Sequence, residues 1–146
     1  MEKLAGRYEL KVNLGQGLMG ESYRALDIQL GREVRVKLMR ADLFDMEETR
    51  ERFLSYVDTC KQASHPSLLK VFDAGKDGKK LYLVTEYTPL RSFRARLKAL
   101  KPGKPLPWAE LEEFFSRLCL ALEELHMHGP HADLKPENIF YVSTDK

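Results

Sequence analysis

A short run of charged and polar residues follows the longest apolar stripe in the chain. Residues 133–138 read Asp-Leu-Lys-Pro-Glu-Asn. In the preceding segment, Trp108 to His128, apolar residues recur every three or four positions, which predicts one long amphipathic helix. These apolar positions are Leu111, Phe114, Phe115, Leu118, Leu122 and Leu125. An ordinary polar turn is the alternative for residues 133–138. We favour a functional loop, because this order of residues rarely occurs by chance directly after such a helix.

The first half of the chain shows the two-residue alternation of apolar side chains that predicts β-strands. One helix is expected to begin near Asp45, where Glu48 completes a capping-box pattern, and to end before Ser64-His65-Pro66. A turn at Gly75–Gly78 joins the last two strands. The prediction is an α+β fold with one helix inserted into a five-stranded antiparallel sheet. Its strands are Arg7–Asn13, Glu21–Leu26, Glu33–Met39, Leu68–Ala74 and Lys80–Tyr87.

Three glycines, Gly15, Gly17 and Gly20, lie between the first two predicted strands. The same spacing occurs in dinucleotide-binding folds, where it opens a helix. Because a strand follows here, the loop is predicted to be the tip of a β-hairpin, and its backbone amides are candidates for binding a ligand. A hairpin turn that uses glycine only for its positive φ angles is the alternative.

Lys37 ends the run Val34-Arg35-Val36-Lys37 on the third predicted strand. A single lysine on a strand is more often a solvated surface residue than a ligand for phosphate. It lies 17 residues after Gly20 and one strand further on, and the other interpretation is a compact positive charge that meets phosphates.

Composition and charge argue against several classes of protein. Hydrophobic residues make up 43% and charged residues 32% of the 146, as in an ordinary soluble globular domain. With 24 Lys and Arg against 22 Asp and Glu, the formal net charge is +2, so no nucleic-acid partner is expected. The two cysteines lack metal-ligand spacing, and the sequence shows neither a secretory signal nor a membrane-spanning run. We therefore expect a cytoplasmic chain without a membrane segment.

In content and order, these segments resemble the eukaryotic-type (Hanks-type) serine/threonine protein kinases, which include bacterial members. The resemblance rests on the glycine loop, the third-strand lysine, Ser64-His65-Pro66, residues 83–87 (Leu-Val-Thr-Glu-Tyr) and the loop at 133–138. It implies a protein-kinase-like fold, with the N-lobe at residues 1–87 and an incomplete start of the C-lobe at 88–146. The C-lobe part would contain two helices, Ser92–Leu100 and Trp108–His128, and the catalytic loop.

The resemblance also implies ATP and Mg²⁺ as cofactors and a role for individual residues. In the catalytic loop, Asp133 would orient the acceptor hydroxyl and take its proton. Lys135 would neutralise charge on the transferred phosphoryl group, and Asn138 would bind Mg²⁺. Thr85 would be the gatekeeper beside adenine. The residues expected to bind the nucleotide are Leu14, Gly15, Gly17, Gly20, Lys37, Glu86 and Thr88, and the segment from Glu86 to Thr88 would read adenine through its backbone.

Four positions depart from the family pattern. Ser22 replaces a valine that covers adenine, Arg35 an alanine, Tyr56 the glutamate that pairs with the lysine, and Ala132 the catalytic-loop arginine. Residues 35 and 37 of one strand share a face, so Arg35 is expected to point into the nucleotide cleft. A cation buried against an apolar ring costs free energy unless it finds an acidic partner.

Two functional hypotheses follow. In the first, the chain is pseudokinase-like, or a fragment, and acts by binding a regulatory protein partner, because Ser22, Arg35 and Tyr56 weaken ATP binding. In the second, it is the N-terminal part of an active ATP-dependent kinase with a protein substrate, because the glycine loop, Lys37 and the catalytic loop are intact. We favour the first. The sequence reaches Lys146 before any Asp-Phe-Gly motif, so phosphoryl transfer is not expected from these 146 residues alone. A truncated product without a stable fold is a third possibility.

Overall fold

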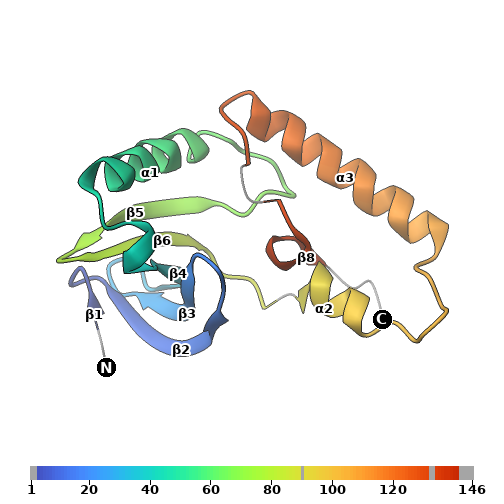
Figure 1. Ribbon diagram of the computed structural model, residues 1–146, viewed down its shortest axis with the longest axis horizontal. Helices are drawn as coiled ribbons and strands as arrows, with labels where there is room; N and C mark the ends of the chain where they lie inside the picture. Colours follow the sequence, from blue (N-terminus) through green and yellow to red (C-terminus); the bar gives the residue numbers. More distant parts are fainter. Residues whose placement is uncertain (1–2, 90, 132–133, 142–146) are drawn as a thin grey trace. The chain divides into compact units, whose positions relative to one another are not determined.

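Residues 3–89, 91–131 and 134–141 are described by the computed structural model of the chain (Figure 1). They form two compact units. The sheet unit runs from the first described residues to Ser64 and from Leu68 to Thr88. The helical unit contains His65–Ser67 and the described residues from Pro89 onward.

The sheet unit is built on an antiparallel sheet with strand order β1-β2-β3-β4-β6-β5. All five predicted strands are present, and a sixth, the two-residue β1, pairs at the edge with β2. The turn that allows this pairing uses positive φ angles at Ala5 (49°) and Gly6 (64°). The strands are β1 (Lys3–Leu4), β2 (Tyr8–Gln16), β3 (Gly20–Asp27), β4 (Arg32–Met39), β5 (Val71–Asp77) and β6 (Lys80–Glu86).

The hairpin between β5 and β6 is tighter than predicted. Asp77 pairs with Lys80, so the turn is made by Gly78 (φ 59°) and Lys79, and Gly75 lies within β5. A Cβ atom on Gly75 would lie 2.6 Å from the hydroxyl oxygen of Tyr82 on the neighbouring strand. Gly75 therefore serves close packing and not chain reversal, which is why the predicted turn was placed too early.

One helix, α1 (Glu47–Cys60), enters after β4 and a short 3₁₀ turn at Ala41–Leu43, as predicted. The predicted capping box is wrong. The N-cap is Met46, whose side chain makes no capping bond. Arg50 reaches back to the carbonyl oxygens of Phe44 (2.6 Å from Nε) and Asp45. These bonds fix the entry of the chain and leave Asp45 one residue before the cap.

A buried hydrophobic cluster of the sheet unit lies on one face of the sheet. Val34 and Val36 of β4 and Val84 of β6 have no exposed surface, and they alternate with residues of the opposite face. The rings of Tyr8 and Tyr82 meet edge to face, with centroids 5.9 Å apart. The buried cluster comprises Leu4, Tyr8, Leu10, Ala25, Val34, Val36, Tyr82 and Val84.

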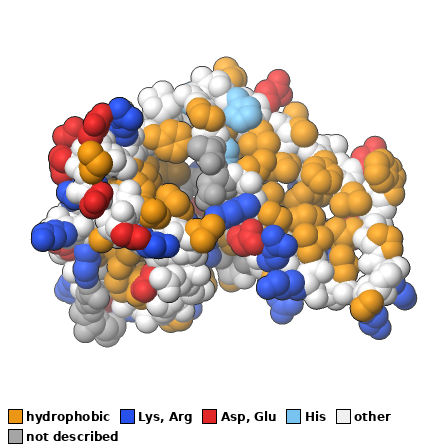
Figure 2. All heavy atoms as spheres, viewed as in Figure 1, with side chains coloured by type: hydrophobic (Ala, Val, Ile, Leu, Met, Phe, Trp, Pro, Cys, Tyr) orange, Lys and Arg blue, Asp and Glu red, His pale blue; other side chains and the backbone are white. Residues whose placement is uncertain are grey.

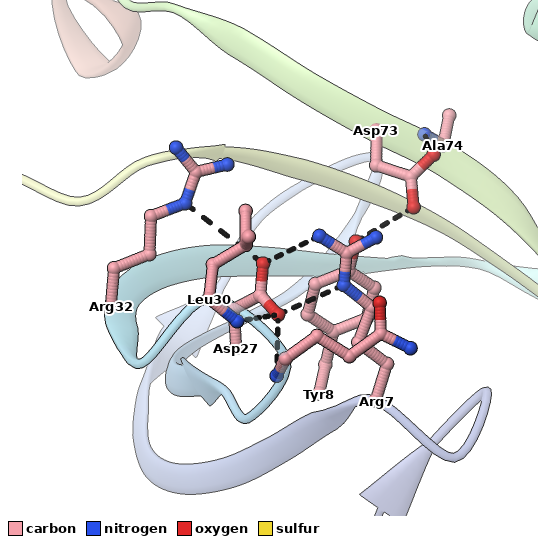
Figure 3. A network of polar contacts seen from close by, with 8 residues as sticks. Arg7, Tyr8, Asp27, Leu30, Arg32, Asp73 and Ala74 are labelled. Atoms are coloured by element: carbon pink, nitrogen blue, oxygen red, sulfur yellow. Dashed lines mark hydrogen bonds and ion pairs between the residues drawn. The ribbon is translucent and has the colours of Figure 1, made fainter.

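A polar network fastens the start of β2 to the end of β3 (Figure 3). The carboxylate of Asp27, 1% exposed, accepts two hydrogen bonds from Arg7, at 2.9 and 2.7 Å. The Arg7 guanidinium holds the pKa of Asp27 below its usual range, although burial acts in the opposite direction. Beside it, the Tyr8 hydroxyl donates to Asp73 of β5 at 2.7 Å. A buried carboxylate is thus paired and hydrogen-bonded, as the low dielectric requires.

Among its described residues, the helical unit contains two α-helices, α2 (Phe93–Lys98) and α3 (Trp108–His126), which confirms both predicted helices. Strand β7 (Arg91–Ser92) pairs with β8 (Phe140–Tyr141), and a 3₁₀ turn, η2, spans Pro136–Asn138. The Ser92 hydroxyl caps α2 by accepting a hydrogen bond from the Ala95 amide at 3.2 Å. Phe93 stacks on Phe114 of α3, with centroids 4.2 Å apart.

The apolar stripe of α3 is only partly covered. Ala121 and Leu125 are buried, whereas Phe115 and Leu120 are 52% and 55% exposed. Figure 2 shows hydrophobic side chains gathered along this helix. Among the described helices, none combines the length and apolar character that crossing a membrane requires.

Candidate functional site: the glycine hairpin, the β4 face and the catalytic loop

The three glycines lie at the end of the β2–β3 hairpin, as predicted, with Gly15 in β2, Gly17 in the turn and Gly20 as the first residue of β3. Pairing continues to Gln16 and Glu21, and the Gly17 amide donates to the Gly20 carbonyl at 2.8 Å. Gly20, with φ of 153°, lies so close to β4 that an added Cβ would be 1.9 Å from the Leu38 carbonyl oxygen. Leu14, just before the first glycine, is 38% exposed. Contact between this hairpin and phosphate stays a prediction.

Strand β4 places Arg35 and Lys37 on the same face, opposite to the core face of Val34 and Val36. Lys37 is paired in register with Ser22 of β3 and with Leu83 of β6. The shared face predicted from the two-residue period is confirmed.

Arg35 is flanked by Arg24 of β3 on one side and by the predicted gatekeeper, Thr85 of β6, on the other. Its side chain is half-buried, and burial lowers the pKa of the Arg35 guanidinium, while Tyr87 acts in the opposite direction. Arg24 pairs with Glu33 at 2.7 Å and lies over the ring of Tyr87, 5.7 Å from its centroid. Like charges at directly opposed positions destabilise a strand pair. This face of the sheet is therefore cationic where the family expectation is apolar.

On α1, Tyr56 occupies the position at which the resemblance expects a glutamate. Its side chain is half-buried and hydrogen-bonded to Cys60, one turn later in the helix. Burial is the larger cause, and this bond the smaller one, that raises the pKa of the Tyr56 hydroxyl. A tyrosine at pH 7 supplies no negative charge to Lys37.

Three acidic residues of α1 pair with other cations. Glu47 pairs with Arg50 and Lys76, Glu48 with Arg52, and Asp58 with Lys61.

The segment after β6 contains the residues predicted to meet adenine. The Glu86 amide donates to the Lys70 carbonyl at 2.8 Å, and the Glu86 carboxylate accepts from the Lys70 amide at 3.1 Å. The amide of Glu86 is thus used within the sheet unit, and Thr88 is the last residue of that unit. Reading of adenine by this segment remains a prediction.

The catalytic loop is described in its second half. The predicted base, Asp133, and its neighbour Ala132 lie outside the described residues. Lys135 precedes η2, and its carbonyl accepts a hydrogen bond from the Asn138 amide at 2.9 Å. The side-chain roles predicted for Lys135 and Asn138 stay predictions. In the part of the chain that the structure describes, no group of three or more His, Cys, Asp or Glu residues is arranged to hold a metal ion.

An arginine of α2 holds this loop in place through an ion pair. The sequence did not predict this pair. Arg94 pairs with Glu137 at 2.7 Å, and this pairing lowers the pKa of the Glu137 carboxyl. The Phe93 amide also donates to the Ile139 carbonyl at 2.7 Å. Because 43 residues separate Arg94 from Glu137, no local pattern could have revealed the pair.

Residues 8–146 match the protein kinase domain family. The chain belongs to the protein kinase family. A probable serine/threonine-protein kinase of Corynebacterium efficiens is 36% identical over 146 residues, which cover 97% of this chain and 22% of that protein. A second, from Streptomyces coelicolor, is 38% identical over 142 residues, covering 94% of this chain and 21% of the relative. The chain thus spans about a fifth of the length of these curated relatives.

Solved structures agree with this assignment. The crystal structure of the PknI kinase domain from Mycobacterium tuberculosis superposes with a TM-score of 0.88 at 25% sequence identity. The match covers 99% of this chain and 58% of that domain. The protein-kinase-like fold and the serine/threonine type of the kinase domain, both implied by the resemblance, are confirmed.

Protein kinases use ATP with Mg²⁺ and act on proteins. The residues present fit the phosphate part of ATP better than its base. The glycine hairpin is formed, and Lys37 faces the same side of the sheet as Ser22. The adenine side carries Arg35, opposite Arg24. A cation that burial already penalises is a poor neighbour for an apolar ring.

Proposed function

We propose that this chain is part of a serine/threonine protein kinase domain whose adenine-facing surface has changed, so that it binds Mg²⁺-ATP weakly and acts mainly by binding another protein. One observation carries the proposal, namely that Arg35 lies half-buried on the Lys37 face, directly opposite Arg24. The lobes would be residues 1–87 and 88–146, and a cytoplasmic location goes with this proposal.

A purine placed on this face would remove water from Arg35 and Arg24 and would return no acceptor to most of their N–H groups, because arginine has five donors and no acceptor. Leaving a buried charged donor unsatisfied costs about 1 to 3 kcal/mol or more. A loss of that size lowers nucleotide affinity by about tenfold to a hundredfold.

Tyr56 adds a second reason for weak catalysis. In the family, a lysine–glutamate ion pair positions the lysine against the phosphates. Tyr56 is neutral and bonded to Cys60, so it does not supply that pair. Lys37 can still meet phosphate as a point charge, but its direction is not set by a glutamate at position 56.

The catalytic loop would still supply its part of the chemistry. Asp133 would orient the acceptor hydroxyl and take its proton, and Lys135 would offset charge on the transferred group. Bound ATP with Mg²⁺ supplies the phosphoryl group, and Asn138 is the residue that would hold a metal ion. Leu14, Gly15, Gly17, Gly20, Lys37 and the segment from Glu86 to Thr88 would hold the nucleotide.

An active kinase is the second candidate, and a specific observation favours it. The Gly15–Gly20 hairpin and the Lys37 face have the expected arrangement, and Arg94 ties down the Lys135–Asn138 loop through Glu137. A domain that transfers no phosphoryl group does not require this loop to be held in place.

Isothermal titration of the full chain with ATP and Mg²⁺ tests the proposal. We expect weak binding that Arg35→Ala strengthens about tenfold, because the desolvation cost of one buried donor group is removed. Lys37→Ala should abolish the remaining binding. Arg52→Ala is the matched control, since it removes one exposed cation of α1. Tight binding by the wild type, unchanged by Arg35→Ala, would support the active kinase instead.

A further inference from the structure

The segment that runs from β7 to the loop after α2 is strongly basic. Residues 91–104 contain six Lys and Arg and no Asp or Glu, and because the whole chain has 24 against 22, the other residues have 18 against 22. Two of the six cations are used within the helical unit, where Arg94 pairs with Glu137 and Arg96 with Glu110. Three of the remaining four lie at the end of α2 and in the loop that joins α2 to α3 (Figure 1).

These three cations are lysines that the backbone holds close together. Lys98 is the last residue of α2, and the chain stays coiled beyond it, since the Leu100 amide donates to the Leu97 carbonyl at 3.2 Å. The Lys104 amide then donates to the Lys101 carbonyl at 3.0 Å, which closes a turn whose end Cα atoms lie within about 7 Å of each other. Within the described part of the chain, the three lysines are exposed and make no ion pair. We call Lys98, Lys101 and Lys104 the basic loop.

An exposed tryptophan follows the basic loop directly. Leu106, which is 8% exposed, packs the loop against the helical unit, whereas Trp108, the first residue of α3, is 76% exposed. The indole ring combines a large apolar surface with one N–H donor, so tryptophan is enriched where an apolar phase meets water, as at the surface of a membrane. The same short segment thus presents positive charge and an amphipathic ring to solvent.

Three acidic residues lie in the first two turns of α3, and two of them are neutralised. Glu110 pairs with Arg96, and Glu113 pairs with Arg117. Glu112 is exposed and, among the described residues, has no ion-pair partner, so it would repel an anionic surface. The three lysines of the basic loop outweigh this single carboxylate, and the four side chains together carry a formal charge of +2.

The choice of lysine indicates what kind of anion the basic loop meets. The guanidinium fork of arginine matches one carboxylate or phosphate in a fixed geometry, and both Arg94 and Arg96 are already paired with carboxylates. Lysine is a hydrated point charge on a flexible stem, which suits a diffuse layer of many anionic headgroups. Trp108 can enter such a layer without a pocket on the partner, whereas an acidic polypeptide would have to supply one.

We propose that the basic loop and Trp108 bind the surface of a membrane that is rich in anionic lipids. The lysines meet the headgroups, and the indole ring enters the layer between them. The contact is peripheral and requires no spanning segment. The inference goes beyond the proposed function and does not depend on it, because none of these residues is expected to touch the nucleotide or to belong to the catalytic loop.

Titration of the full chain with lipid vesicles at low ionic strength tests this inference. Trp108 is the only tryptophan of the sequence, so its fluorescence reports on the contact directly. Vesicles of equal parts phosphatidylglycerol and phosphatidylcholine should bind the chain and shift this emission to the blue, and added salt should weaken the binding. Vesicles of phosphatidylcholine alone should give no shift. A wild type whose emission is unchanged by the anionic vesicles would overturn the inference.

Three variants separate charge, ring and fold, with binding measured by cosedimentation. Lys101→Ala combined with Lys104→Ala should weaken binding about thirtyfold, because each lysine near an anionic surface contributes about fivefold. Trp108→Ala should weaken it about tenfold through lost apolar contact. Glu112→Gln should strengthen binding, a change of sign that no folding defect produces. Thermal melts confirm that each variant is folded.

The matched control is Arg52→Ala combined with Lys79→Ala, which removes two exposed cations of the sheet unit and so changes the net charge equally. This variant should bind the anionic vesicles as the wild type does. Equal weakening in both double variants would mean attraction by net charge alone and would overturn the inference.

Polyglutamate tests the other source of negative charge. Binding of polyglutamate that needs Lys101 and Lys104, without a blue shift on vesicles, would show that the basic loop recognises an acidic polypeptide and would refute the membrane contact. A parallel titration with Mg²⁺-ATP separates the inference from the proposed function. The double lysine variant should bind Mg²⁺-ATP as the wild type does, so loss of vesicle binding alone supports the membrane contact whatever Arg35→Ala does to the nucleotide.

Discussion

The sheet unit and the helical unit differ in how completely they bury their apolar side chains. In the sheet unit, Val34, Val36 and Val84 have no exposed surface, and the buried carboxylate of Asp27, at the end of β3, is paired with Arg7. In the helical unit, α3 buries Ala121 and Leu125 but leaves Trp108, Phe115 and Leu120 more than half exposed. The difference teaches that stability resides mainly in the sheet unit, whereas the helical unit holds the Lys135–Asn138 segment by single pairs such as Arg94 with Glu137.

The largest expected effect comes from matched leucines of the two units. Leu81 of β6 is 2% exposed and Leu120 of α3 is 55% exposed. Leu81→Ala should lower the free energy of unfolding by about 3 kcal/mol, because it leaves a cavity in a packed core. Leu120→Ala should change it by less than about 0.5 kcal/mol. Urea denaturation followed by circular dichroism measures both, and equal losses would break the contrast between the units.

Asp27→Asn should cost about 2 kcal/mol at pH 7, because Arg7 loses the carboxylate that accepts its two hydrogen bonds. The pKa of Asp27 is lowered in the folded state, mainly by the bond from Arg7. The stabilisation is therefore complete above the unfolded pKa of about 4 and is lost as pH falls through the lower, folded pKa.

Urea midpoints measured between pH 7 and pH 3 test this dependence. The gap between the wild type and Asp27→Asn should narrow below about pH 4. Asp42→Asn is the control, because Asp42 pairs with Arg40 at an exposed site. A gap that stays constant with pH would show that Asp27 acts by its shape and not by its charge.

A smaller effect is expected at the cap of α2 in the helical unit. Ser92→Ala removes the acceptor of the Ala95 amide and should destabilise the first turn of the helix by about 1 kcal/mol. Hydrogen exchange of the Ala95 amide should accelerate, by about fivefold for such a loss. Ser116→Ala, at an exposed position of α3, should leave this rate unchanged. Identical exchange in both variants would show that the cap does not hold α2.

The smallest predicted effect is a gain in the sheet unit. Helix α1 begins at Met46, which is 62% exposed and has the extended backbone (φ −82°, ψ 135°) of a capping residue without a capping side chain. Met46→Asp should stabilise the chain by about 0.5 kcal/mol, since aspartate can accept from the free amides of the first turn. A rise in the melting temperature measures it, and Met127→Asp after α3 should give none.

The sequence predicted the features that depend on periodicity. The two-residue alternation placed Arg35 and Lys37 on one face and Val34 and Val36 on the other, and the three-to-four spacing predicted α3. These features depend on local geometry that every strand or helix shares. The order of motifs likewise predicted the family.

The features that the sequence did not predict have no signature in the local pattern. Strand β1 needs a positive φ angle at Ala5, for which alanine gives no signal. The cap of α1 was misplaced for a local reason, because Arg50 binds the carbonyl groups of Phe44 and Asp45, six and five residues before it, and the capping pattern does not show this contact. The Arg7–Asp27 pair joins residues 20 apart and has no local signature either.

Gly20 leaves no room for any other residue, because a side chain would collide with the backbone of β4. Gly17 is different, since its added Cβ would meet nothing nearer than 3.9 Å and its φ angle is not in the left-handed region. In the evolution of this hairpin, a glycine at position 20 records only a steric constraint, which persists whether or not nucleotide binds. Position 17 has no such constraint within the chain, so a side chain there would be limited only by what approaches the loop from outside. Among relatives that have lost nucleotide binding, position 17 is therefore the one expected to diversify first.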